Sequence, residues 1–151
     1  MNTSTPGEPL VLLLVEDNDA HAELVQRSLE QHKVSNVIQH VDDGQKALDY
    51  IFREGDYTDD EEYPLPHCIL LDLRLPKVDG LEVLRRIKTS ENRKKTPVVI
   101  LTTSAADKDI ATAYEYHANS YVVKPMVFSK FEALMDDLGY YWMIWNQNPQ
   151  P

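Results

Sequence analysis

The strongest constraint on the fold of this chain is an alternation between short, mainly apolar runs and segments whose apolar residues recur every three to four positions. Short runs of this kind are typical of strands buried on both faces of a parallel sheet. The segments between them have the period of amphipathic helices. The five runs occupy residues 10–15, 37–41, 68–71, 98–101 and 121–123. The chain is therefore predicted to repeat a strand-helix unit five times.

Strands that alternate with helices predict an α/β fold, in which right-handed crossovers build a parallel sheet covered on both faces. The most economical arrangement is a flavodoxin-like doubly wound sheet with strand order 2-1-3-4-5 and five helices. The predicted apolar helix faces are Ala22, Val25 and Leu29; Ala47, Leu48 and Ile51; Leu81, Leu84 and Ile87; and a weaker set of Ile110, Ala113 and Tyr114. Sheets of this order bind ligands where strands 1 and 3 end, so a site is expected there.

The length of 151 residues indicates one domain over residues 1–151. We expect residues 1–9 to be a flexible N-terminus, and residues 53–67, which contain six acids and two prolines, to be a loop. The last helix is predicted to begin near Ser129, its N-cap. Residues 140–151 are expected to extend that helix as an aromatic tail.

The composition argues against several kinds of function. A formal net charge of −10 disfavours direct nucleic-acid binding, because phosphate contacts need clustered lysines and arginines. The sequence has neither a spanning apolar run of about 18 residues nor a secretory signal, so we expect a soluble, cytoplasmic protein that binds no membrane. The single cysteine, Cys68, is expected to be a buried thiol.

Three carboxylates follow two of the predicted strands. Glu16 and Asp17 come directly after the first strand, and Asp72 comes directly after the third. Acids at strand ends are often solvated loop residues, but three that converge repel one another unless a proton or a cation is present. Because the predicted ligands are all oxygens, the hard ion Mg²⁺ suits such a site.

A hydroxyl and an ammonium group are predicted at the same edge of the sheet. Thr102 ends the fourth strand and Lys124 follows the fifth. Lys124 could simply form an ion pair with Asp72. Together, however, these groups suit phosphoryl transfer, in which Asp72 is the nucleophile, Lys124 and Thr102 bind phosphoryl oxygens, and Glu16 and Asp17 hold the metal.

These residues resemble the receiver domains of two-component response regulators. The matching strings are LLLVEDND at 12–19, LLDLRLPKVDGLEVL at 70–84, VVILTTS at 98–104 and SYVVKP at 120–125. The resemblance implies that Asp72 is the phosphorylation site, Thr102 and Tyr121 are the switch residues, and the backbone carbonyl of Arg74 is a further metal ligand. It also implies a cis bond between Lys124 and Pro125.

The chain is also similar to the small single-domain regulators that partner bacterial and cyanobacterial phytochromes. This similarity rests on VEDNDAHAELVQ at 15–26, GDY at 55–57, LTTSAADKDI, AYEYHANSY at 113–121 and the aromatic tail. It implies a histidine kinase, and specifically a phytochrome, as the phosphoryl donor, with kinase contacts around residues 20–24. It implies no enzymatic activity beyond the protein's own phosphorylation and dephosphorylation, and an output through altered protein binding.

A homodimer is predicted through the fourth helix, fifth strand and fifth helix, where Tyr114, Tyr116 and the tail aromatics are expected to gather. The alternative is that Tyr141, Trp142 and Trp145 continue the core stripe of the last helix. Arg74 and Ser104 lie two positions after Asp72 and Thr102. We expect Arg74 to shield the acyl phosphate from water.

Three rival functions are less consistent with the sequence. A haloacid-dehalogenase-type phosphatase would need a second aspartate where Arg74 stands. A flavodoxin-like cofactor binder would need a first loop that binds phosphate, whereas the negative charges of Glu16 and Asp17 repel a phosphate group. A receiver-shaped scaffold that is never phosphorylated stays open, because a fold does not fix a function.

Overall fold

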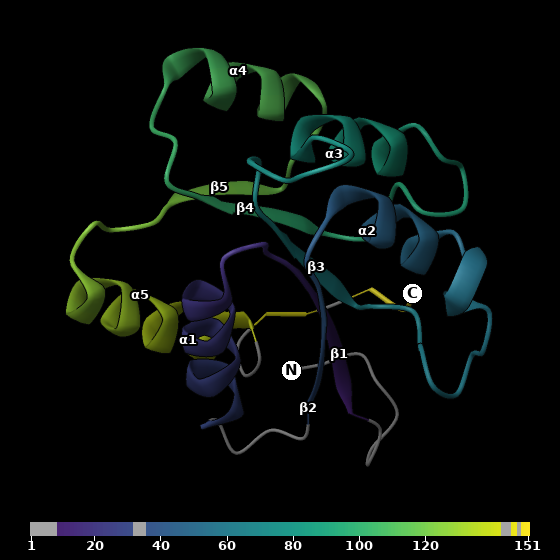
Figure 1. The fold of residues 1–151 in the computed structure, drawn as a ribbon, viewed down its shortest axis with the longest axis horizontal. Helices are drawn as coiled ribbons and strands as arrows, with labels where there is room; N and C mark the ends of the chain where they lie inside the picture. Colours follow the sequence, from purple (N-terminus) through teal and green to yellow (C-terminus); the bar gives the residue numbers. More distant parts are fainter. Residues whose placement is uncertain (1–8, 32–35, 143–145, 148) are drawn as a thin grey trace.

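The computed structural model describes residues 9–31, 36–142, 146–147 and 149–151. Its centre is a sheet of five parallel strands in the order β2-β1-β3-β4-β5 (Figure 1). The strands are β1 Leu10–Val15, β2 Asn36–Val41, β3 Cys68–Leu71, β4 Val98–Thr102 and β5 Ser120–Val123. Each predicted run forms a strand, with one added residue in β2, β4 and β5. The predicted doubly wound order is confirmed.

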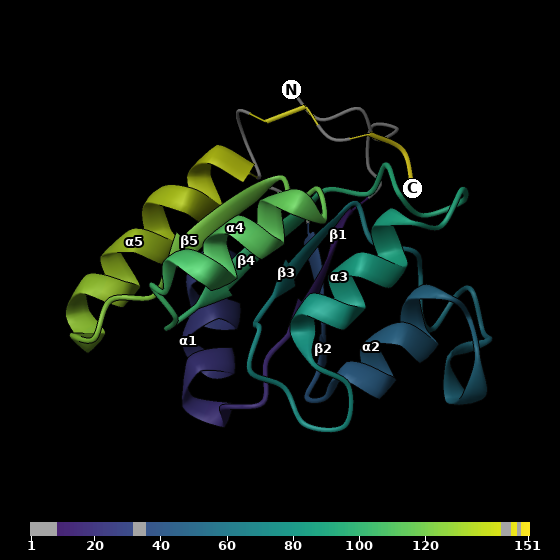
Figure 2. The same cartoon turned by 90° about the horizontal axis from the view of Figure 1, so that it is seen from above.

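Five helices cover the two faces of the sheet (Figures 1 and 2). They are α1 Asp19–Glu30, α2 Gly44–Ile51, α3 Gly80–Lys88, α4 Asp107–Glu115 and α5 Phe128–Tyr140. Helices α1 and α5 pack on one face with a core that includes Val25, Leu29 and Phe131. Helices α2, α3 and α4 pack on the other face, where Leu48 and Leu84 are buried.

Strand β1 is buried on both faces, which explains its uninterrupted apolar sequence. Leu12 and Leu14 point to the core under α1 and α5, whereas Leu13 and Val15 point to the core under α2 and α3. Side chains alternate between the faces of a strand, so both faces of this one need apolar residues. Burial of each leucine contributes roughly 1.5–3 kcal/mol relative to exposure.

Side-chain caps fix the starts of the first three helices. Asn18, Asp43 and Asp79 each accept a hydrogen bond from a backbone N–H in the first turn of α1, α2 and α3. Helix α5 begins at Phe128, close to the predicted start, but the predicted N-cap Ser129 is wrong: the N-cap is Val127, which has no side-chain cap. The Val127 carbonyl accepts the first helical bonds, from the N–H groups of residues 130 and 131, which places Ser129 inside the first turn.

The acidic connection between α2 and β3 is largely irregular, as predicted, with one 3₁₀ turn over Gly55–Tyr57 (η1). Tyr50, Tyr57 and Tyr63 form a cluster in which each ring contacts the other two, with centroids 4.8–5.8 Å apart. The Tyr50 hydroxyl also donates to the carbonyl of Pro64 at 2.7 Å. These contacts anchor the loop to α2.

The aromatic tail divides between the core and the surface. Trp142 is buried in the core under α1 and α5, so for this residue the alternative of a continued core stripe is confirmed. Tyr140 and Tyr141 are more than half exposed. Trp145 and residues 1–8 of the flexible N-terminus predicted over residues 1–9 lie outside the described residues. Cys68 is a buried free thiol, as expected.

On α4 the predicted apolar face is only partly correct, because Ala113 is buried whereas Tyr114 is about half exposed at 49%. None of the helices in the described part of the chain has both the length and the apolar composition needed to cross a membrane.

Candidate functional site

The carboxyl edge of the sheet brings together the side chains that the sequence singles out. Strands β1 and β3 pair so that Val15 lies opposite Leu71. The pairing continues past the strands, because the Asp72 N–H donates to the Val15 carbonyl at 3.0 Å and the Lys124 N–H donates to the Thr102 carbonyl at 2.7 Å. These backbone hydrogen bonds therefore fix the Cα positions of Asp72 and Lys124 at the edge of the sheet.

Glu16, Asp17 and Asp72 form an acidic cluster. Each offers a carboxylate oxygen, and these three oxygens lie within 4.8 Å of one another. Glu16 and Asp72 are buried, so the interpretation as solvated loop acids is wrong for them, whereas Asp17 is exposed. Oxygen donors that open to solvent on one side fit a hard divalent cation that retains some of its water.

Lys124 is buried against this cluster. Its ammonium nitrogen donates to Glu16 Oε1, to Asp72 Oδ2 at 3.0 Å and to His21 Nδ1 at 3.1 Å. An ammonium group has three N–H donors, and these three acceptors can use all of them. The ion pair with Asp72 that the sequence suggested as an alternative is therefore present, and it coexists with the predicted phosphoryl-transfer set.

The pKa values of the two buried carboxyl groups, Glu16 and Asp72, are shifted in opposite directions. Burial and the charge of Asp72 raise the pKa of Glu16 to about 7, although Lys124 opposes the change. Burial also acts to raise the pKa of Asp72, but the charge of Lys124 and hydrogen bonds from Glu16, Lys124 and Thr102 outweigh it, so this pKa lies below its usual value. Near neutral pH a proton therefore resides on Glu16 for much of the time, and Asp72 stays ionised.

Thr102 and Tyr121 are the two predicted switch residues. Thr102 is fully buried beside Asp72, and its hydroxyl is one of the groups that lower the pKa of that carboxyl group. Tyr121 is partly buried, and its hydroxyl donates to the Ser104 carbonyl at 2.9 Å. The backbone between β4 and α4 therefore connects the two side chains.

The loop from Asp72 to Asp79 is held close to the helices on either side of it. A Cβ atom on Gly80 would lie 2.2 Å from the Asp72 carbonyl oxygen, and one on Gly44 would lie 1.8 Å from the Val78 carbonyl oxygen. Gly80 is therefore needed for the close approach of α3 to the loop after β3. Within the loop Lys77 adopts a left-handed conformation with φ of 69°.

An open cavity of about 300 Å³ lies above Asp72. The predicted residues Glu16, Asp17, Asp72, Arg74 and Lys124 line it, together with Asn18, His21 and Thr103. The Arg74 N–H donates to Asp72 Oδ1 at 3.2 Å, whereas the metal-binding role of the Arg74 carbonyl stays a prediction. The cavity leaves room for a small group next to the Asp72 carboxylate.

His21 is a site residue that sequence reasoning did not find. It accepts a hydrogen bond from Lys124, which is 103 positions away in the sequence. Burial and the nearby charge of Lys124 lower its pKa, which favours the neutral imidazole that this bond needs. No spacing in the sequence relates the two residues.

The predicted cis bond between Lys124 and Pro125 is wrong, because none of the described peptide bonds is cis. The trans form is intrinsically favoured by about 0.5–1 kcal/mol in bonds before proline. The chain therefore passes from β5 into α5 through trans bonds.

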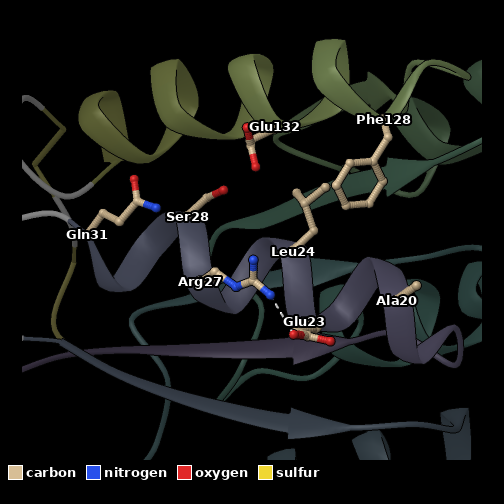
Figure 3. A pocket seen from close by; sticks show the side chains of 8 residues that line it. All are labelled: Ala20, Glu23, Leu24, Arg27, Ser28, Gln31, Phe128 and Glu132. Carbon is tan, nitrogen blue, oxygen red and sulfur yellow. Dashed lines mark hydrogen bonds and ion pairs between the residues drawn. The ribbon is translucent and has the colours of Figure 1, made fainter.

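A second, smaller cavity of about 100 Å³ lies between α1 and α5 (Figure 3). Leu24 of α1 and Phe128 of α5 lie side by side in it, and Arg27 forms an ion pair with Glu23 at 2.6 Å along one side. Ala20 and Leu24 belong to the segment where kinase contacts were expected.

Comparisons with known proteins agree with this geometry. Residues 12–136 match the response regulator receiver domain family. The probable methanogenesis regulatory protein FilR2 of Methanothrix harundinacea is 46% identical over 145 residues, which cover 95% of this chain and 90% of FilR2. Response regulator Rcp1 of Synechocystis is 38% identical over 135 residues, which cover 89% of this chain and 90% of Rcp1.

Two solved structures are similar over nearly the whole chain. The Mn²⁺-bound form of Rcp1 superposes with a TM-score of 0.89 at 37% identity and covers 94% of this chain and 100% of its own. The phosphorylated cyanobacterial phytochrome response regulator RcpA also has a TM-score of 0.89, at 36% identity, and covers 95% of this chain and 100% of its own. The chain described here therefore belongs to the response regulator receiver family of signalling proteins.

Proposed function

We propose that Asp72 accepts a phosphoryl group from a histidine kinase and that the protein signals through altered protein binding. The observation that carries this proposal is the buried, ionised Asp72 carboxylate, which lies below an open cavity and 3.0 Å from the Lys124 ammonium group. A carboxylate with a lowered pKa is ready to act as a nucleophile at neutral pH.

The proposed reaction makes one bond and breaks one. An Asp72 oxygen attacks the phosphorus of a phosphohistidine, an acyl phosphate forms, and the histidine nitrogen leaves with the electron pair of the broken P–N bond. Lys124 and the Thr102 hydroxyl stabilise the charge on the phosphoryl oxygens. Glu16, Asp17, Asp72 and the Arg74 carbonyl would hold Mg²⁺, which when bound neutralises charge on the same oxygens.

The output is proposed to be a change of surface rather than an enzymatic reaction on another molecule. A new phosphoryl group would draw the Thr102 hydroxyl toward it, and Tyr121 would then exchange its bond to the Ser104 carbonyl for a more buried position. Phosphorylation and dephosphorylation of Asp72 would be the only reactions that the protein promotes. The net charge of −10 supports a protein target rather than a nucleic acid.

A phytochrome histidine kinase is the proposed phosphoryl donor, because RcpA is a phytochrome response regulator of the same fold and similar length. FilR2, at 46% identity, is a probable methanogenesis regulatory protein, so a kinase that is not a phytochrome is the second candidate donor. The cavity between α1 and α5, where the exposed Phe128 lies beside Glu23, Arg27 and Glu132, is the proposed contact for either kinase (Figure 3). Transfer from purified phosphorylated kinases of the two kinds would separate these possibilities.

A homodimer through α4, β5 and α5 is proposed for the signalling state. Tyr114 on α4 and Val123 on β5 are 49% and 38% exposed, and apolar side chains that lie together on one face support an interface. Sedimentation with and without a phosphoryl analogue tests this. A monomer in both states at high concentration would contradict the proposal.

Labelling with acetyl phosphate and Mg²⁺, followed by intact-mass measurement, tests the central proposal. The wild type should gain one phosphoryl group, and Asp72→Asn should gain none. Asp56→Asn, which removes an exposed acid of the loop before β3, is the matched control and should be labelled like the wild type. A wild type that gains no mass would favour a scaffold that is never phosphorylated.

A further inference from the structure

Asp109 is a carboxylate that the proposed phosphoryl-transfer set does not include. It lies in the first turn of α4, and a single oxygen, Oδ2, accepts two hydrogen bonds. One comes from Arg74 Nη2 at 3.0 Å and the other from the Ser104 hydroxyl at 2.5 Å. The Asp109 side chain is only 15% exposed, although its partner Arg74 is 68% exposed.

These contacts connect α4 to the two loops that follow β3 and β4. Arg74 lies two residues after Asp72, and Ser104 lies two residues after Thr102. The Ser104 N–H donates to the Thr102 hydroxyl oxygen at 3.5 Å, and the Ser104 carbonyl accepts from Tyr121. Asp109 is thereby joined to the loop that bears the acceptor and, through Ser104, to both switch residues.

The pair between Arg74 and Asp109 contributes little to folding stability. Exposed ion pairs are typically worth about 0–1 kcal/mol, and Arg74 loses side-chain entropy when it is held. The ion pair instead affects the position of the Arg74 side chain. Arg74 lines the cavity above Asp72, and its guanidinium group is bonded to Asp109. A guanidinium group held there would hinder the approach of water to an acyl phosphate on Asp72.

We propose that Asp109 is a positioning residue, which holds Arg74 across the mouth of the Asp72 cavity and thereby slows hydrolysis of the acyl phosphate. This inference rests on the proposed phosphorylation of Asp72. In this inference, a contact between α4 and the loop after β3 controls how long the phosphorylated state lasts. Because α4 belongs to the proposed dimer face, a partner that shifts α4 would also change that lifetime.

The test is a double-mutant cycle on the rate at which the purified, phosphorylated protein loses its phosphoryl group. Asp109→Asn and Arg74→Ala should each speed hydrolysis about two- to fivefold, the change expected for a contact of this strength. The double variant should hydrolyse no faster than Arg74→Ala alone, because Asp109 acts through Arg74. A role that was only structural would instead make the two effects multiply.

Asp107→Asn is the matched control. Asp107 is an exposed acid of the same helical turn, so its loss removes the same charge from the α4 N-terminus and should leave the hydrolysis rate unchanged. Three results would overturn this inference but leave the proposed function standing. They are rate effects of Asp109→Asn and Arg74→Ala that multiply in the double variant, an unchanged hydrolysis rate in Asp109→Asn, and an equal rate change in Asp107→Asn. A wild type that takes up no phosphoryl group would overturn the proposed function and this inference with it.

Discussion

Lys124 Nζ lies 3.0 Å from Asp72 Oδ2, although the two residues are 52 positions apart in the sequence. The same nitrogen also donates to Glu16, so one buried ammonium group serves two buried carboxylates. Two negative charges and one positive charge are unbalanced in a buried site, and a proton on Glu16 or a bound cation restores the balance. This arrangement makes the site responsive to protons, cations and phosphoryl groups.

Replacing Lys124 with alanine should destabilise the metal-free protein strongly. The change leaves Glu16 and Asp72 buried without their cation, and removal of one partner of a buried pair typically costs about 3–5 kcal/mol. Urea unfolding at pH 8 in EDTA measures the loss. Lys46→Ala, which breaks an exposed pair with Asp42, is the control and should cost less than about 1 kcal/mol. Equal losses in the two variants would contradict the prediction.

The metal-free protein should become less stable as pH rises from 5 to 8. The folded-state pKa of Glu16 is raised from 4.5 to about 7, so in this window the folded protein retains a proton that the unfolded chain has lost. The stabilisation from this group is complete below about pH 4.5 and disappears as pH rises through 7, a loss of roughly 3 kcal/mol. Urea unfolding in EDTA at several pH values measures it.

Glu16→Gln is the control for this pH dependence, because it removes the titrating group. His21 contributes the opposite slope, since its pKa is lowered, but Glu16 is not among the groups that lower it. The difference between the wild type and Glu16→Gln therefore isolates the proton on Glu16. Parallel pH profiles of the two proteins would show that this proton is absent.

Alanine at Gly80 should disturb both stability and phosphorylation. The new Cβ would meet the Asp72 carbonyl oxygen at 2.2 Å, so α3 or the loop after β3 must move. Overpacking of this kind typically costs about 1–3 kcal/mol. Denaturation and acetyl-phosphate labelling measure the two effects. Gln45→Ala, at an exposed position of α2, should change neither, and normal labelling by Gly80→Ala would contradict the expected movement at Asp72.

Glycine at His117 should stabilise the protein. His117 follows the C-cap of α4 with φ of 69°, and the N–H groups of His117 and Ala118 donate to the carbonyls of Tyr114 and Ala113. This pattern favours glycine, because a side chain strains the left-handed conformation. We expect a gain of about 0.5–1 kcal/mol in the free energy of unfolding, measured by thermal or urea unfolding. His117→Ala keeps the Cβ atom and should give no such gain.

The sheet and most of the acidic cluster could be predicted because both follow from local patterns. Buried parallel strands need apolar residues on both faces, so their ends are easy to find in the sequence. Once the strand order is known, Glu16 and Asp72 must lie beside each other. Lys124 is predictable for the same reason, because it directly follows β5.

Two contacts made by side chains of helix residues could not be predicted. His21 meets Lys124 and Asp109 meets Arg74 because turns and helix positions place them together, and no periodicity encodes such pairs. The N-cap of α5 was missed for another reason. Ser129 is a favoured capping residue, but backbone bonds to the Val127 carbonyl begin the helix without any side-chain cap.

The burial of Trp142 has an optical consequence. Trp142 and Cys68 line one cavity at the start of β3. Asp72 is four positions after Cys68, which corresponds to about 13 Å along an extended strand. A phosphoryl group on Asp72 is therefore too distant to quench the indole by contact. In a Trp145→Phe protein, any change of tryptophan fluorescence upon phosphorylation would report movement of the α5 end against the sheet, which gives an intrinsic probe of long-range signalling.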